Sequence, residues 1–471
     1  CALKILPKHI WGNISANDFP LSPYNLQPIG SGPYIVKTVN RDKNNNIVAL
    51  SLAPNEYYYG QKPHLQNFTF SFFNSNESLM SAIRRNAIQA FAPEGTGNQN
   101  NIAVEGTYDY SFLLPRYFAL FFNSNKNPAL ADKYVRQALN YATNKTEIIQ
   151  QVLNGKGTVV NSPILPDYFG LNAPTINYNY DIEQAANLLD KEDFKISDNG
   201  IRVKSVNKKP AFTFTKNLTK GSKLDPDVKE LQKCLQKEVA PDIQISGNFG
   251  ADTLDAVNKF QEKYRSDILD PNGLNAPTGD VKQATRDKLN QVCFPAGNQT
   301  IPLHFTITTV DQPIMVASAN LIKTQWQAIG AAVDIKIEDI DSLENNTIKP
   351  RDYEILLFGE ILGSKPDPFP YWSSTQINDP GLNLALFQNT DADKLLNNIR
   401  QATDDNSRNA SLENFQNLLL DDAPAVFLYN PDYIYTVSDK IQGIKAGKIA
   451  TPPQRFATVN EWYTQVKRVW K

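Results

Sequence analysis

A short loop holds the side chains whose types are best suited to bind a small molecule. It runs from Gly363 to Trp372, is rich in proline and follows a predicted strand at Tyr353–Gly359. In α/β proteins, ligands bind at loops that leave strand ends. The sequence therefore predicts ligand-binding roles for four side chains of this loop: Ser364, Asp367, Tyr371 and Trp372. The alternative is a structural turn, with Trp372 packed in the core and Asp367 shaping the turn beside its proline.

Tyr117 and Asn123 are two further candidates, on a predicted buried strand at Leu113–Phe122 and directly after it. Tyrosine offers a large apolar face and one hydrogen-bonding group at low entropic cost, which suits a pocket that accepts varied ligands. The alternative for Tyr117 is simple packing within a sheet.

Residue types that would support catalysis are scarce. The chain has three histidines, and none has cysteine, aspartate or histidine neighbours at the spacing of a metal site. It has neither the G-x-S-x-G elbow of a nucleophilic serine nor the G-x-x-x-x-G-K-S/T loop that holds phosphate. Neighbouring carboxylates such as Asp404 and Asp405 point about 100° apart on a helix and are typical of solvated faces. We therefore predict a binding protein, not an enzyme, with no cofactor and no metal.

The composition sets the broad class. The chain has 471 residues, of which 41% are hydrophobic and 20% charged, and its formal net charge is −2. That balance supports ordinary globular cores and gives no electrostatic signature of nucleic-acid binding. The longest apolar run, near Tyr117–Phe122, is far shorter than the roughly 20 residues of a membrane-spanning helix.

Strands and helices alternate over much of the chain. A hairpin is predicted at Tyr34–Val39 and Ile47–Ala53, one helix over Asp132–Leu153 and another over Asp181–Leu189. From Leu303 the expected order is a strand, a helix, two strands, two helices and two strands, ending in a short helix at Val459–Val469. This pattern predicts an α/β fold with sheets covered by helices.

Residues 217–298 differ from the rest, because they show no strand pattern and predict three short helices. The spacing of Gly247, Thr253 and Val257 recurs in Gly279, Thr285 and Leu289. Each glycine can form a tight turn before the next helix. So small a core benefits from a cross-link, and the first and third helices carry Cys234 and Cys293. We predict a disulfide between them; two free buried thiols are the alternative.

Most of the remaining chain resembles the family 5 extracellular solute-binding proteins, which serve peptide and nickel ABC importers. Six segments carry the resemblance in the family's order: Ile5–Trp11, Pro28–Tyr34, Asn55–Pro63, Val135–Lys145, Tyr180–Leu189 and Pro366–Ser374. The second resembles the family's GTGPY turn. The last resembles the loop that faces the ligand in the family.

The resemblance implies two α/β lobes that close over a peptide or peptide-like solute, and a membrane permease that recognises the closed form. The family often has an acidic residue that pairs with the peptide amine where this chain has Ser364. A serine cannot form that ion pair, and Asp367 is a nearby substitute. Because the family also has residues before its GTGPY turn, we expect Cys1 to be a truncation point rather than a lipidated terminus. Any lipid anchor would then lie on the missing part, and the expected location is extracytoplasmic.

The central segment resembles a small three-helix peptidoglycan-binding domain, through Val228–Leu235, Gly247–Gln261 and Thr278–Asn290. This implies attachment to the cell wall. The predicted organisation is a first lobe in 1–115, a second lobe in 116–215 and 300–440, the insert in 217–298 and a return to the first lobe in 441–471. The alternative function is a cell-wall hydrolase or a scaffold that senses wall fragments.

Overall fold

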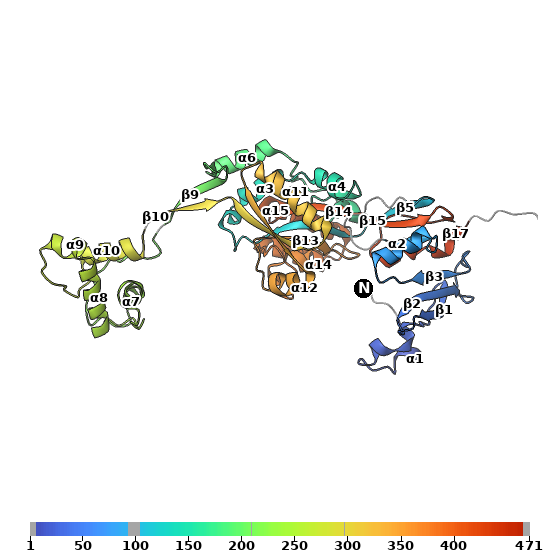
Figure 1. The fold of residues 1–471 in the computed structure, drawn as a ribbon, viewed down its shortest axis with the longest axis horizontal. Coiled ribbons are helices and arrows are strands. Elements are labelled where there is room, and N and C mark those ends of the chain that lie inside the picture. Colours follow the sequence, from blue (N-terminus) through green and yellow to red (C-terminus); the bar gives the residue numbers. More distant parts are fainter. Residues whose placement is uncertain (1–5, 93–103, 209, 296, 465–471) are drawn as a thin grey trace, which may run out of the picture. The chain divides into compact units, whose positions relative to one another are not determined.

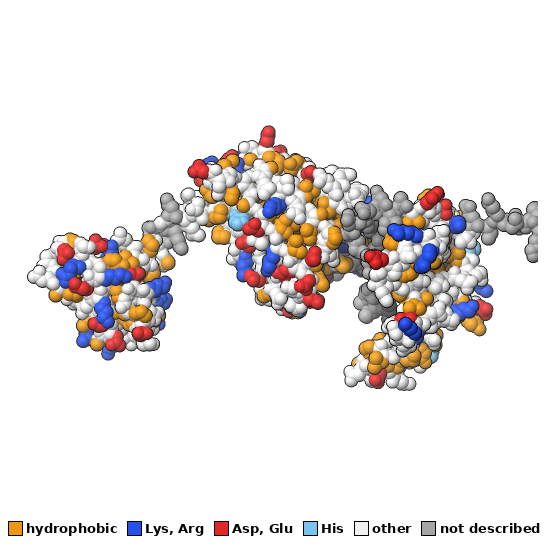
Figure 2. All heavy atoms as spheres, in the orientation of Figure 1, with side chains coloured by type: hydrophobic (Ala, Val, Ile, Leu, Met, Phe, Trp, Pro, Cys, Tyr) orange, Lys and Arg blue, Asp and Glu red, His pale blue; other side chains and the backbone are white. Residues whose placement is uncertain are grey.

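The computed structural model describes residues 6–92, 104–208, 210–295 and 297–464. The chain divides into two compact units, one formed by Cys1–Leu189 with His304–Lys471 and the other by Asp190–Leu303. Strands and helices alternate through the larger unit, so the predicted α/β class is confirmed. Acidic and basic side chains are interspersed over the visible surface of both units (Figure 2).

The larger unit contains a six-stranded mixed sheet (Figure 1). Its spatial order is β12-β11-β13-β6-β14-β7, with β11 parallel to both neighbours and the remaining pairs antiparallel. The strands are β6 (Arg116–Phe122), β7 (Gly157–Val159), β11 (His304–Val310), β12 (Ala332–Glu338), β13 (Ile355–Ile361) and β14 (Ala425–Pro431). Strands β6, β13 and β14 are largely buried, as their runs of apolar residues lead one to expect.

The two faces of this sheet are covered by different aromatic clusters. On one face, Trp326 of α11 packs against Phe122 and Phe305, and its indole N–H donates to Thr143 Oγ1 at 2.9 Å. On the other face, Trp372 packs against Phe121.

A register shift between Phe427 and Tyr429 of β14 places one ring in each of these clusters. It places Phe427 beside Trp372, whereas Tyr429 contacts Phe118 and Ser318. Residues two apart on a regular strand lie on the same face of the sheet. The two rings lie on opposite faces because this bulge interrupts the alternation.

The helices of the larger unit are mostly short. They are α1 (Lys8–Trp11), α2 (Asn76–Arg84), α3 (Lys133–Tyr141), α4 (Lys145–Val152), α5 (Pro166–Phe169), α6 (Ile182–Lys191), α11 (Pro313–Gln327), α12 (Ile340–Ser342), α13 (Phe369–Trp372), α14 (Thr390–Gln401) and α15 (Asp405–Asp422). Short 3₁₀ segments lie at Phe19–Leu21, Pro23–Asn25, Pro128–Ala131, Ser374–Gln376, Pro452–Phe456 and Val459–Glu461, and a π-helical segment lies at Leu343–Ile348.

Three smaller sheets complete this unit. They comprise β1 (Tyr34–Arg41), β2 (Ile47–Pro54) and β3 (Phe68–Ser71); β4 (Ala90–Phe91), β15 (Tyr433–Ser438) and β5 (Thr107–Phe112); and β16 (Ile441–Gln442) with β17 (Tyr463–Thr464). The β1–β2 hairpin agrees with the prediction. Two connections join the β4-β15-β5 sheet to the six-stranded sheet: 113–115 between β5 and β6, and Asp432 between β14 and β15.

The smaller unit combines a three-stranded antiparallel sheet with helices. Its elements are β8 (Lys195–Ile196), β9 (Arg202–Lys208), α7 (Pro226–Glu238), α8 (Ala251–Lys263), α9 (Arg265–Ile268), a 3₁₀ turn at Asp270–Asn272, α10 (Gln283–Cys293) and β10 (Gly297–Pro302). Figure 1 shows the β9–β10 ribbon running to the four helices. The three predicted helices correspond to α7, α8 and α10.

Two buried glutamines explain the repeated spacing in this unit. Gln232 Oε1 accepts from the backbone N–H of Gly247, and its Nε2 donates to Asn248 O and Thr253 Oγ1. Its counterpart, Gln261, makes the equivalent bonds with Gly279 N, Asp280 O and Thr285 Oγ1. Each glutamine therefore ties a glycine turn, with φ of +78° or +71°, to the helix that follows.

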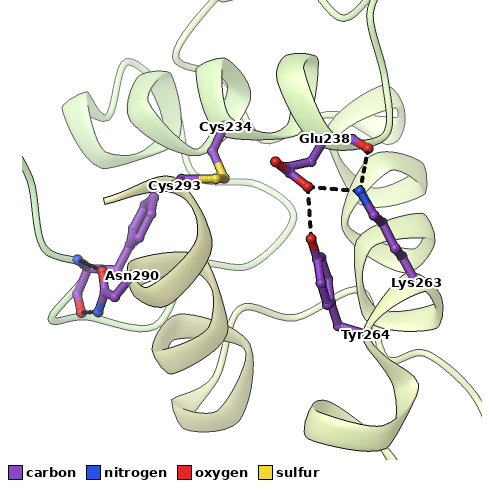
Figure 3. The surroundings of a disulfide bond; sticks show 7 residues. Cys234, Glu238, Lys263, Tyr264, Asn290 and Cys293 are labelled. Carbon is purple, nitrogen blue, oxygen red and sulfur yellow. Dashed lines mark hydrogen bonds and ion pairs between the residues drawn. A yellow bond between two sulfur atoms is a disulfide. The ribbon is translucent and has the colours of Figure 1, made fainter. Parts of the chain in front are cut away.

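A disulfide joins α7 to α10, between Cys234 and Cys293 (Figure 3). The Cα atoms are 5.7 Å apart, a usual separation for such a bond. Nearby, the Glu238 carboxylate accepts from Lys263 Nζ at 2.8 Å and from the Tyr264 hydroxyl at 2.9 Å, which ties α7 to α8.

Several expected elements differ from the structure. The helix predicted over Asp132–Leu153 is wrong, because it is two helices separated at 142–144. Asn144 caps the second by accepting from Glu147 N at 3.1 Å, and its own N–H donates to Gln325. The predicted C-terminal helix is wrong within the described residues, which hold a single turn and β17 there; 465–469 lie outside them.

The compact smaller unit comprises Asp190–Leu303, and in it strands β8, β9 and β10 lie next to the helices of the predicted insert at 217–298. The chain returns to the sheet of β4 and β5 at Tyr433.

Candidate functional site

A carboxyl group and a phenol form a buried pair at the end of the six-stranded sheet. Glu360 of β13 and Tyr117 of β6 are direct partners in the antiparallel register, so both side chains leave the same face. The Tyr117 hydroxyl donates to Glu360 Oε2. Only 4% of Glu360 and 0% of Tyr117 is exposed.

The burial of this pair keeps both side chains uncharged at neutral pH. Burial raises the pKa of Glu360 to about 8, and the hydrogen bond from Tyr117 only partly opposes that effect. Burial also raises the pKa of Tyr117 well above its usual value, and the neighbouring Glu360 adds to the increase. At pH 7 the Glu360 carboxyl therefore retains its proton.

Trp372 covers this pair. Its ring lies 6.2 Å from that of Phe121 and 5.8 Å from that of Phe427, measured between centroids. Its indole N–H is near enough to the Tyr117 hydroxyl to lower the pKa of that group. Trp372 Nε1 and Glu360 Oε1 are nevertheless buried without a hydrogen-bond partner among the described residues.

The loop from β13 to α13 is held at both ends. The backbone N–H of Leu362 donates to Pro115 O at 2.7 Å. Further along, both oxygens of Asp367 accept from Arg400, and Asp367 Oδ1 also accepts from the N–H of Phe369. The Arg400 guanidinium lies 3.9 Å from the Phe369 ring centroid, a cation–π contact. Asp367 is therefore engaged within the loop.

The structure brings together some of the predicted site residues and separates others. Tyr117 contacts Glu360, and Trp372 and Tyr371 lie near Tyr117. The pKa of Tyr371 is raised by burial first, and then by the neighbouring Glu360 and Asp367. Ser364 is exposed in the loop.

Asn123 lies past the opposite end of β6, about 20 Å from Tyr117 at the usual rise per strand residue. Its amide donates to Arg351 O at 3.1 Å, and its Oδ1 accepts from Asn125 N. It does not join the other candidates.

Glu360 is the residue that sequence reasoning missed. The predicted strand ends at Gly359 and the candidate loop begins at Gly363, so Glu360 falls in neither. The available signal was an acidic residue in the largely apolar run Ile355–Ile361. A buried carboxylic acid in such a strand is rare unless it has a partner.

The site also lies beside the two chain connections that leave the six-stranded sheet, 113–115 and Asp432. Arg116, next to Tyr117, donates through Nη2 to Pro431 O at 3.4 Å, and Asn430 donates to Leu114 O at 2.9 Å.

Among the described residues, no group of three histidine, cysteine, aspartate or glutamate side chains could hold a metal ion.

Comparison with known proteins identifies the family. Residues 2–264, more than half of the chain, match the bacterial extracellular solute-binding proteins, family 5, middle region. The chain belongs to this family. The match continues past β9 into the smaller unit and ends at the C-terminus of α8.

Two relatives of this family 5 solute-binding protein are named as peptide-binding proteins. The oligopeptide-binding protein AppA of Bacillus subtilis is 22% identical over 466 residues, which are 98% of this chain and 66% of AppA. The dipeptide-binding protein of Escherichia coli is 30% identical over 168 residues, 35% of this chain and 30% of that protein. The chain thus spans about two thirds of AppA's length.

Solved structures support the same fold. The ABC transporter substrate-binding protein CtaP of Listeria monocytogenes superposes with a TM-score of 0.66 at 19% identity, over 98% of this chain and 71% of CtaP. AppA of Bacillus subtilis, solved with a nonapeptide, gives 0.55 at 20% identity, over 98% and 72%. The predicted two-lobed periplasmic-binding-protein fold is confirmed.

Proposed function

We propose that this family 5 protein is the ligand-binding component of an ABC importer for peptides or peptide-like solutes. The observation that carries the proposal is the buried Glu360–Tyr117 pair, which lies beside both chain connections in a protein of this family. Its unpartnered polar atoms fit a site that is completed by a ligand.

The two connections, 113–115 and Asp432, give such a site a means of signalling. A ligand that contacts residues on both sides stabilises the closed arrangement, and a permease at the membrane then recognises that arrangement. The protein acts extracytoplasmically in this proposal. No helix of the described residues is long and apolar enough to cross a membrane.

A thermal-shift screen of the full chain tests the proposal. The panel contains peptides of two to ten residues, muropeptides from cell wall, and nickel. A ligand at 100 times its Kd adds about 2.7 kcal/mol to the stability of the folded state. A shift with peptides supports the importer, a shift with muropeptides alone points to a wall-sensing scaffold, and the absence of any shift contradicts the proposal.

We also propose that the helical insert binds peptidoglycan and keeps the receptor near the wall. What supports this is the three-helix sequence pattern together with the place of the helices at the end of the β9–β10 ribbon. Lys208 and Gly297 are backbone partners in that ribbon, so a two-residue Asn-Gly turn can replace 209–296 and leave a closed hairpin.

Co-sedimentation with purified wall sacculi separates the two roles. The full chain is expected to pellet with the sacculi, and the hairpin-closed variant is expected to stay in solution while keeping its peptide-induced thermal shift. Equal sedimentation of the two proteins would contradict wall binding by the insert. Release of soluble muropeptides by the full chain would instead support a hydrolase.

A further inference from the structure

Two buried polar atoms flank the Tyr117 hydroxyl without hydrogen-bond partners among the described residues: Glu360 Oε1 and Trp372 Nε1. Buried polar groups are nearly always paired in folded proteins, because leaving one unpaired costs free energy. Two such atoms around one hydroxyl therefore indicate where a missing partner belongs.

The hydrogen-bonding properties of these two atoms limit which ligand groups can pair with both. An indole N–H can only donate, whereas a protonated carboxyl can both donate and accept. An amide matches both, since its carbonyl can accept from Trp372 and its N–H can donate to Glu360. An ammonium group brings donors alone, which would meet the indole donor, and a carboxylate brings acceptors and a charge into a buried surrounding.

The titratable groups near Glu360 also favour an uncharged ligand group. They are Tyr117 from β6 and Tyr371 from α13, with Asp367 acting on Tyr371 from the loop. Burial and the Tyr117 hydrogen bond set the pKa of Glu360, and the result is a neutral acid.

On the basis of the proposed importer function, we propose that Glu360, Tyr117 and Trp372 form a subsite for an uncharged amide group of the ligand. The amide belongs either to the peptide main chain or to a carboxamide side chain. Glu360 and Trp372 are 4% and 1% exposed, so this proposal requires the segment between Leu362 and Trp372 to give up its contacts with Pro115 and Arg400 before a ligand reaches them. The subsite thereby couples ligand contact to the position of this loop.

The test uses the full chain with tetra-alanine and with versions that carry Gln, Glu or Lys at each position in turn. Affinity is measured by calorimetry for the wild type and for Glu360→Gln, Glu360→Leu and Trp372→Phe. Tyr429→Phe is the matched control, because it removes a buried hydroxyl from the opposite face of the same sheet.

The proposal expects about a tenfold loss of affinity in Glu360→Leu and Trp372→Phe, since each lacks one hydrogen bond to the ligand. Glu360→Gln keeps a donor and an acceptor and stays within about threefold of the wild type. Tyr429→Phe binds as the wild type does. Loss in the two variants with tetra-alanine itself identifies a main-chain amide, and loss with a Gln peptide alone identifies a carboxamide side chain.

Proton linkage gives an independent readout. Calorimetry at pH 7 in two buffers of different ionisation enthalpy is expected to show almost no proton release, because Glu360 remains protonated beside an amide. Release of about one proton per ligand, absent in Glu360→Gln, would mean a cationic ligand group and overturn the proposal. Peptide binding that is unchanged in Glu360→Leu and Trp372→Phe would overturn this subsite alone. Failure of every peptide to bind the wild type would overturn the importer function as well.

Discussion

Glu360 and Tyr117 lie directly opposite each other on antiparallel strands, and the phenol donates to the carboxyl in the interior of the larger unit. Their neighbours on the same face of the sheet are the aromatic rings of Trp372 and Phe427. An apolar pair would pack there without a desolvation cost. The polar pair instead keeps a titratable carboxyl in a buried place, which raises the pKa of Glu360 to about 8.

The first prediction is that Glu360 makes folding stability fall as pH rises. Its pKa is about 8 when folded and about 4.3 when unfolded, so the folded state holds the proton more tightly. The stabilisation relative to Glu360→Gln is complete below the unfolded pKa and is lost as pH rises through the folded value. The slope between those limits approaches about 1.4 kcal/mol per pH unit.

Urea denaturation followed by tryptophan fluorescence at pH 5, 6, 7 and 8 measures this slope. The relevant quantity is the difference between the wild type and Glu360→Gln, since the other titrating groups cancel in it. A difference that does not change with pH would show that Glu360 is ionised throughout.

The second prediction concerns the disulfide in the insert. Cys234 and Cys293 are 59 residues apart, and closing a loop of that length stabilises the folded state by about 4 kcal/mol in the chain-entropy view. Replacing both by alanine should therefore lower the stability of the smaller unit and leave the six-stranded sheet protected. Amide hydrogen exchange, read separately for α8 and β6, measures both effects.

Reductant should have the same effect on the wild type and none on the hairpin-closed variant, which lacks both cysteines. Mass spectrometry with and without reductant checks the bond itself. Two free thiols after oxidative expression would contradict the disulfide.

The sequence predicted the fold well where local patterns and packing agree. Alternating residues marked the β1–β2 hairpin, and helical spacing marked α7, α8 and α10. The single helix predicted over Asp132–Leu153 was wrong because the apolar stripe continues from α3 into α4. The break between the two helices is determined by the hydrogen bonds of Asn144, which the stripe does not reveal. Asn144 with Glu147 three residues later was a helix-start signal within that stripe.

The candidate site was predicted less completely, because it depends on strand register. Tyr117 was proposed from its residue type and its predicted strand, and Tyr371 and Trp372 from the loop that follows another predicted strand. Their convergence on Glu360 follows from β13 pairing antiparallel to β6, and no spacing within a single segment contains that information. Asn123 looked equally suitable, but the direction of β6 carries it away from the other three.

The third prediction tests the glutamine bonds that repeat in the insert. Gln232→Ala would leave the N–H of Gly247 and the hydroxyl of Thr253 without their bonds to this amide, and should cost about 2 to 4 kcal/mol. Gln261→Ala should cost a similar amount. The matched control is Gln236→Ala on the same helix, which loses one bond to Ile243 O and should cost under about 1 kcal/mol.

These losses are measured by hydrogen exchange in α8 and α10. Equal, small losses in all three variants would mean that the amides contribute little beyond what water supplies.

The last prediction separates two roles for Asp367, as a ligand group or as a support of the loop. Its oxygens accept from Arg400, and the guanidinium also lies against Phe369. Both charged side chains are partly exposed, so Asp367→Asn should lower the free energy of unfolding by no more than about 1 kcal/mol. As a support, Asp367 should lose its effect in an Arg400→Leu background, so the double variant should match Arg400→Leu in stability and in peptide affinity. A drop of tenfold or more in peptide affinity in Asp367→Asn, undiminished in the Arg400→Leu background, would instead show that Asp367 contacts the ligand directly.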